Sequence, residues 1–315
     1  MESDEGSSGR PHTAVLEAAP ARVRPARRGA GPVWDDGAGE LLWVDTAGQV
    51  RWGGLDATGG VRDLAVRPVG EPLAAVALTT SSGWLVAAGS GLRGLTPDGA
   101  VSVLLDLEGA GRMCSGACDR AGRFFAGVTG LHGHEEVGLG ALYRVDLDGV
   151  VSTAATGLMD PAGIAWSPDD DVLYVADPGA RTVTAYDYDV DLGATDRPRV
   201  VLDFPVDEPA IPDGLTVDRA GHLWVALDGG GQVRRYSSAG RPEEAVRVPA
   251  KQTSGCTFAG PGLDILVVTT SAEGLPYPER VAQPDAGRLF TVRMTDVVGS
   301  AACRYRGPLR RLTNA

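Results

Sequence analysis

"IPDGLTVDRAGHLWVAL", residues 211–227, joins two short strand-like segments through a turn rich in aspartate and glycine. Its second segment, LWVAL (223–227), is one of six similar apolar runs. The other five are LLWVD (41–45), WLVAAG (84–89), RFFAGV (123–128), LYVAD (173–177) and LVVTT (266–270). Their first residues are separated by 43, 39, 50, 50 and 43 positions. A repeat of this length, with room for four short strands, predicts an all-β, six-bladed β-propeller.

A further strand-like run follows each of the six, usually after a glycine, as in GQVRW (48–52) and GQVRRY (231–236). Amphipathic helical periodicity is hard to find anywhere in the chain. Glycine and proline are spread evenly, without a linker-like block that would divide the sequence. We therefore expect a disordered tail over residues 1–13 and a single propeller domain over residues 14–315.

The composition limits the classes of partner. A formal net charge of −12 argues against nucleic acid and anionic membranes, and no apolar run is long enough to cross a bilayer. The first residues lack the features of a secretory signal, so a cytoplasmic location is expected. The basic run ARVRPARRGAG (21–31) predicts a solvated strand edge. Without framework spacing, the cysteines are expected to be free thiols; they are Cys114, Cys118, Cys256 and Cys303.

The innermost strand of each propeller blade lines the central channel, and its first residues lie at one mouth. Aligning the repeats gives GAGPVWD (29–35), CSGACD (114–119), PAGIAWS (161–167), PDGLTVD (212–218) and TSGCTFA (253–259). In four of these, one residue stands directly before a glycine: Ser115, Ala162, Asp213 and Ser254. Because glycine permits a close or left-handed backbone, we expect this residue to point toward the channel axis. Asp213 is thus predicted to be a site residue.

Several longer motifs, taken in order, resemble the SMP-30/gluconolactonase family, also called regucalcin-like. They are GPVWDDGAGELLWVD (31–45), RMCSGACDRAGRFFAG (112–127), GIAWSPDDDVLYVAD (163–177), IPDGLTVDRAGHLWVA (211–226) and QPDAGRLFTV (283–292). The resemblance covers the chain from about residue 14. It implies a six-bladed propeller and hydrolysis of small lactones with the help of one divalent ion, often calcium or zinc.

The resemblance also implies a ligand set for that ion, which this sequence keeps only in part. The aspartate ligand, also the family's candidate general base, matches Asp213. The glutamate and asparagine ligands fall on Ala30 and Ala162, which have no donor atom. Calcium takes six to eight oxygen ligands and zinc about four donors, so the ordinary metal site is expected to be absent.

The family's substrate-binding residues are also only partly present. Its substrate arginine matches Arg112, whereas the asparagine two residues later is Cys114 and the following aspartate is Ser115. Our preferred interpretation is a metal-independent enzyme for a small molecule, with no cofactor. Asp213 would act as acid or base, Arg112 would anchor an anion or stabilise an oxyanion, and Cys114 would be nucleophile, acid or pocket wall.

In this interpretation the substrate pocket is lined by Ser115, Ala162, Ser254 and Ala30. An Asp–Arg pair could catalyse hydrolysis, cyclisation, isomerisation or elimination, and the expected setting is a biosynthetic, specialised-metabolite pathway. A second interpretation is a metal-dependent lactonase with relocated ligands. The relocated ligands would come from LHGHEEVG (131–138). For His132 and His134 in this segment, however, contact with the substrate is the favoured prediction over metal binding. A third is a non-catalytic small-molecule-binding propeller. The oligomeric state is left open.

Overall fold

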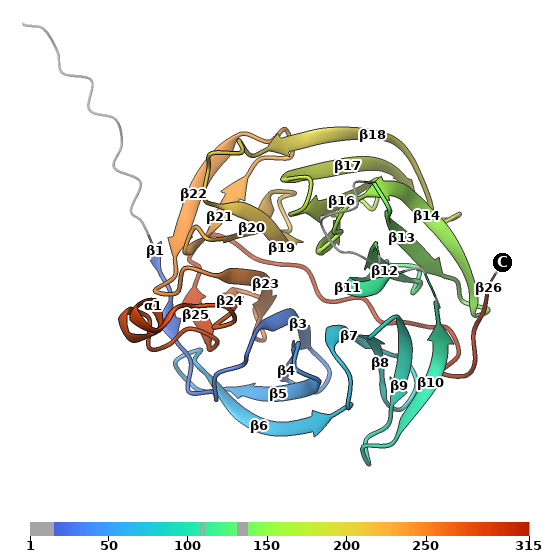
Figure 1. Cartoon of the computed structure of the whole chain (residues 1–315), viewed down its shortest axis with the longest axis horizontal. Helices are drawn as coiled ribbons and strands as arrows, with labels where there is room; N and C mark the ends of the chain where they lie inside the picture. Colours follow the sequence, from blue (N-terminus) through green and yellow to red (C-terminus); the bar gives the residue numbers. More distant parts are fainter. Residues whose placement is uncertain (1–15, 108, 110, 131–137, 315) are drawn as a thin grey trace, which may run out of the picture.

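Six β-sheets surround a central channel in the computed structural model, which describes residues 16–107, 109, 111–130 and 138–314 (Figure 1). The strands of the first three blades are β3 (Gly29–Asp35), β4 (Glu40–Asp45), β5 (Gln49–Leu55) and β6 (Val61–Pro68); β7 (Leu73–Leu78), β8 (Trp84–Ala88), β9 (Gly91–Leu95) and β10 (Val101–Asp106); and β11 (Arg112–Cys118), β12 (Phe124–Thr129), β13 (Gly140–Val145) and β14 (Val150–Leu158). Within each blade, neighbouring strands pair antiparallel.

The remaining blades continue the pattern around the ring. Their strands are β15 (Gly163–Trp166), β16 (Val172–Asp177), β17 (Thr182–Asp189) and β18 (Ala194–Asp203); β19 (Ile211–Val217), β20 (Leu223–Asp228), β21 (Gln232–Tyr236) and β22 (Pro242–Arg247); and β23 (Thr253–Ala259), β24 (Ile265–Thr270) and β25 (Leu289–Arg293). The six-bladed propeller predicted from the repeat is confirmed. The inner strand of the second blade, β7, carries no glycine after its first residue and was absent from the sequence alignment.

The sixth blade is completed by the other end of the chain. Strand β2 (Ala19–Pro20) pairs antiparallel with β25, so that a segment near the N-terminus forms the outer strand of the last blade. Two further short strands pair in parallel with outer strands: β1 (Leu16–Glu17) with β22 and β26 (Thr313–Asn314) with β14. The ring is therefore closed by hydrogen bonds between residues distant in the sequence.

The apolar core of the described residues consists of six clusters, each between two neighbouring blades. One example is the pair of Trp224 and Phe258, whose rings meet edge to face with centroids 5.8 Å apart. Truncating an aromatic side chain in such a core costs about 3–5 kcal/mol. This packing holds the inner strands, and with them the channel mouth, at fixed positions.

The C-terminal segment 299–307 lies across the far mouth of the channel, where the inner strands end (Figure 1). The amide of Gly299 donates to the carbonyl of Leu263 at 2.8 Å, and the amide of Tyr305 donates to the carbonyl of Leu78 at 2.8 Å. The described helix α1 (Tyr277–Ala282) belongs to the insertion between β24 and β25. Nowhere in the described ranges is there a helix long and apolar enough to cross a membrane.

Candidate functional site

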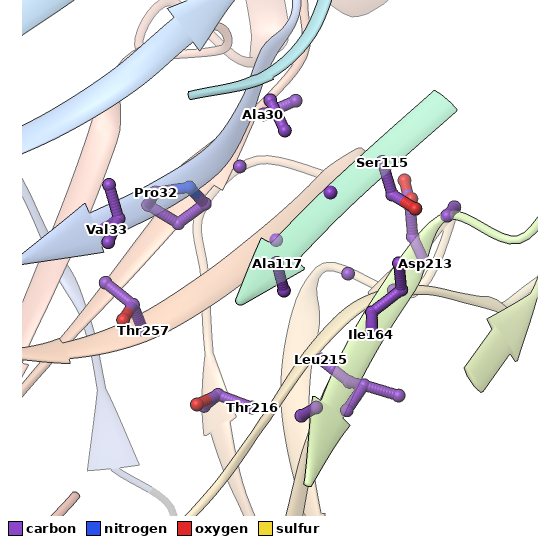
Figure 2. A pocket seen from close by; sticks show the side chains of 18 of the residues that line it. Ala30, Pro32, Val33, Ser115, Ala117, Ile164, Asp213, Leu215, Thr216 and Thr257 are labelled. Carbon is purple, nitrogen blue, oxygen red and sulfur yellow. The ribbon is translucent and has the colours of Figure 1, made fainter. Parts of the chain in front are cut away.

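The central channel holds a cavity of about 1200 Å³ lined by the inner strands of all six blades. At one end lie the first residues of these strands, including Asp213 on β19 and Ser115 on β11, both labelled in Figure 2. Further along the channel the lining is mostly apolar or hydroxylated, as at Val33, Ile164 and Thr257 (Figure 2). We call the mouth where the inner strands begin the site mouth. Charged residues of the lining also follow the ends of β11, β15 and β19, at Arg120, Asp170 and Arg219.

Glycines bring the inner strands close together at the site mouth. A Cβ atom added to Gly163 would lie 2.6 Å from the carbonyl oxygen of Asp213, and one added to Gly214 would lie 2.7 Å from the Cα atom of Gly255. Neither Gly163 nor Gly214 has a positive φ. Of the two reasons considered for these glycines, the structure therefore supports close approach of the backbones rather than a left-handed conformation.

Asp213 lies on β19 with only 5% of its surface exposed, and its carboxylate faces the cavity. Its Oδ2 atom accepts a hydrogen bond from Nη2 of Arg28. Burial raises the pKa of Asp213 to about 7; the carboxylates of Asp228 and Asp160 act in the same direction, while the guanidinium of Arg28 opposes them. A carboxyl group with this pKa exchanges its proton near neutral pH, as a general acid or base must.

Arg28 was not among the predicted site residues, because the run 21–31 was interpreted as a solvated edge. That interpretation is wrong for Arg28: its side chain is 29% exposed and reaches across the site mouth, where Nη1 donates to Oδ2 of Asp228 at 3.3 Å. The amide of Thr46 donates to the carbonyl of Arg28 at 2.9 Å and fixes its backbone. The charge of Asp213 raises the pKa of Arg28 further, so this cation is permanent.

The predicted serines line the cavity, but their hydroxyl hydrogens are used by the fold. The Oγ atom of Ser115 donates to the carbonyl of Pro161, and that of Ser254 donates to the carbonyl of Gly29 at 2.5 Å. These bonds link neighbouring blades at the site mouth. Both oxygens can still accept hydrogen bonds from a ligand.

Arg112 and Cys114, both on β11, also line the cavity. Arg112 is exposed and makes no ion pair with another described residue. The Sγ atom of Cys114 donates to the carbonyl of Pro161 at 3.3 Å. Burial, followed by the charge of Asp160, raises the pKa of the Cys114 thiol well above its usual range. This environment disfavours the thiolate that nucleophilic catalysis requires.

The remaining predicted positions differ in what the structure says of them. Ala30 and Ala162 are partly buried and present only methyl groups to the cavity. His132 and His134 lie outside the described residues. Sequence reasoning missed further carboxylates of the cavity lining, because none belongs to an aligned inner strand; they are Asp160, Asp170, Asp228 and Glu273.

A divalent ion does not fit the donor set that the described residues provide. The carboxylate of Asp213 is in contact with a guanidinium, and the positions across from it, Ala30 and Ala162, have no donor. Among the residues that the structure describes, no group of three or more His, Cys, Asp or Glu side chains could hold a metal ion. The neighbouring carboxylate of Asp228 contacts the same guanidinium, and calcium and zinc both need more ligands than these two residues supply.

Residues 28–272 match the family described as "SMP-30/Gluconolactonase/LRE-like region". The chain belongs to this family. It is 31% identical to regucalcin of Oryctolagus cuniculus, over 89% of this chain and 95% of the relative. It is 30% identical to the Bacillus subtilis (strain 168) protein named "Putative sugar lactone lactonase YvrE", over 84% and 91%. The solved structure of a calcium-binding regucalcin from Agrobacterium tumefaciens str. C58 superposes with a TM-score of 0.83 at 27% identity, over 93% and 99%.

Membership in the family agrees with the resemblance seen in the motifs. The surroundings of Asp213, however, differ from those that the resemblance implies. The Agrobacterium relative is described as calcium-binding. In this chain a guanidinium contacts Asp213, the residue that the sequence resemblance aligns with a metal ligand of the family. One signal in the sequence could have suggested this: Arg28 stands two residues before Ala30, the position at which an acidic ligand is missing.

Proposed function

We propose that this protein hydrolyses small lactones or related cyclic esters without a divalent ion, using Asp213 as the general base. The observation that carries the proposal is a buried carboxylate at the site mouth whose pKa is about 7. The family's description and the lactonase name of the Bacillus subtilis relative support a lactone as the substrate class. The substrate is a small molecule, because the cavity is a channel about 1200 Å³ in volume rather than an open face.

The reaction needs one proton carrier. A water oxygen attacks the carbonyl carbon and forms the new C–O bond, while the carboxylate of Asp213 takes a proton from that water. The ring C–O bond then breaks, and its alkoxide oxygen receives the proton from Asp213. The product is a hydroxy acid, which loses its acidic proton to solvent. Arg112 lines the cavity, makes no ion pair with another described residue and can bind an anionic or hydroxylated part of the substrate.

The test is ring opening of a panel of five- and six-membered sugar lactones. The reaction is monitored through the acid that it releases into a weakly buffered indicator solution. The protein is first dialysed against a chelator, and its residual metal is measured by elemental analysis. Asp213→Asn keeps the shape of the side chain and removes its base. Asp187→Asn is the matched control, because Asp187 pairs with Arg199 on the outer part of the fourth blade at 2.6 Å.

We expect turnover of at least one lactone that persists in metal-free protein. Asp213→Asn should lower kcat by a factor of about 10²–10⁴, the usual contribution of a general base, while Asp187→Asn should match the wild type. Full activity of Asp213→Asn would refute its role. Loss of activity on chelation that is restored by calcium or zinc would refute metal independence.

A further inference from the structure

The site mouth contains a permanent cation that the family relationship does not predict. The guanidinium of Arg28 lies between two carboxylates, contacting Asp213 through Nη2 and Asp228 through Nη1. It enters from the segment before β3, whereas both carboxylates belong to the fifth blade. The contact therefore depends on the closed ring rather than on any local motif.

This arrangement leaves part of the guanidinium available to a ligand. Arginine carries five N–H donors in a planar fork, and two of them make the contacts to Asp213 and Asp228. No other described residue accepts from the rest. The side chain is 29% exposed and belongs to the lining of the cavity, so its remaining donors are directed to cavity or solvent.

We propose that Arg28 replaces the divalent cation of this family, and that its free N–H groups bind the carbonyl oxygen of a neutral cyclic ester next to Asp213. This inference names the electrophile of the site and so rests on the proposed function for its chemistry. Its structural half, the occupation of the cation's place by a side chain, stands independently of any reaction.

The surrounding charges favour a neutral ligand over an anionic one at this position. With both carboxylates ionised, the unit of Arg28, Asp213 and Asp228 carries a net charge of −1. A neutral ester carbonyl can accept from the guanidinium without opposing that charge. The carboxylate formed by ring opening meets two like charges at short range and is repelled. The same unit therefore binds the substrate and promotes release of the product.

The first experiment measures metal binding and needs no activity. Isothermal titration with CaCl2 and MnCl2 is carried out on four folded proteins: the wild type, Arg28→Met, Ala30→Glu/Ala162→Asn, and the triple variant that combines all three substitutions. If Arg28 occupies the cation's place, restoring the two ligands is insufficient while it remains. We expect the triple variant to bind at least tenfold more tightly than the double variant. Equal affinity of the two, or no binding by a folded triple variant, would overturn the inference.

The second experiment tests the electrophile. As a donor to an oxyanion in the transition state, Arg28 should contribute on the order of a hundredfold to kcat, so that Arg28→Met loses that factor. The control is Arg199→Met, since Arg199 is exposed and pairs with Asp187 on the outer part of the fourth blade. Binding of δ-valerolactam, a neutral cyclic carbonyl that resists hydrolysis, should weaken at least tenfold in Arg28→Met and not in Arg199→Met. Equal effects of the two substitutions would overturn the role of Arg28.

The two experiments separate this inference from the proposed function. Tight metal binding by the triple variant, in a protein that opens no lactone, would support the replacement of the cation and refute the hydrolysis. Lactone hydrolysis with no difference in metal binding between the double and triple variants would support the proposed function and refute the replacement of the cation.

Discussion

Replacing Asp213 by asparagine should change how the stability of the protein depends on pH. In the folded state the pKa of Asp213 is about 7, against an ordinary value of 3.8 for an aspartate in an unfolded chain. The folded protein therefore binds this proton more tightly than the unfolded chain does. Between about pH 4 and pH 7 the wild type loses stability as the pH rises, and above pH 7 the full penalty is present. Asparagine carries no such proton, so the variant lacks this loss.

The size of the effect follows from the two pKa values. A difference of about three pKa units, at 1.36 kcal/mol per unit, corresponds to about 4 kcal/mol once both states are ionised. At pH 5 the unfolded chain is already ionised, and somewhat more than one third of this penalty is present. Between about pH 5 and pH 8 the wild type should therefore lose about 2.5 kcal/mol of unfolding free energy relative to Asp213→Asn.

The assay is equilibrium urea unfolding of both proteins at pH 5 and pH 8, in which other titrating groups cancel in the difference. Asp35→Asn is an informative control, because the carboxylate of Asp35 is also held by an arginine, Arg304. Burial acts to raise the pKa of Asp35, but hydrogen bonds from Arg304 and Ala38 outweigh it, so the pKa is lowered. Its carboxylate is ionised in both states at both pH values. Asp35→Asn should lose the same free energy at pH 5 and pH 8. Parallel curves for wild type and Asp213→Asn would refute a raised pKa at Asp213.

Three further outcomes are expected at the site mouth. In lactone hydrolysis, kcat/KM should rise with pH to a plateau above about pH 7. Arg28→Met should move the midpoint of this rise to a higher pH by about one to three pH units, because it removes the charge that opposes protonation of Asp213. An unchanged midpoint would contradict the assignment of Asp213 as the base. Gly214→Ala should lower activity by about a hundredfold, since its Cβ would meet backbone 2.7 Å away, whereas Gly262→Ala in a surface turn should not; initial rates and melting curves of the two variants decide the matter. Cys114→Ser should retain near wild-type kcat/KM, and the wild type should resist inactivation by a thiol alkylating agent, because burial holds the pKa of the Cys114 thiol high.

The architecture could be predicted from sequence because the second and third strands of each blade are recognisable as glycine-bounded, β-branched runs at a regular spacing. Strand β7, LAAVAL, escaped the alignment because no glycine marks its start and alanine gives little strand signal. The position of Asp213 could be predicted because the adjacent glycine, Gly214, is required for close packing of inner strands.

The partners of Asp213 could not be predicted in the same way. Arg28 and Asp228 are 185 and 15 positions away from it along the chain. Arg28 precedes β3 and Asp228 ends β20, so neither belongs to an inner strand. A basic run before a strand has the same appearance in sequence whether its arginines point to solvent or across a channel. Here Arg27 is exposed and pairs with Glu273, and only the closed ring determines which of the two arginines contacts Asp213.

Closure of the sixth blade by β2 also has a consequence in time. Residues 19–20 pair with residues 290–291, so β2 cannot pair until β25 has been synthesised. At a synthesis rate of ~5–20 residues per second, this wait is on the order of 15–50 s. During that interval the edge on which β2 will pair does not yet exist, and five blades can form before the sixth is complete. The finished ring therefore forms only after residues 290–291 have been synthesised.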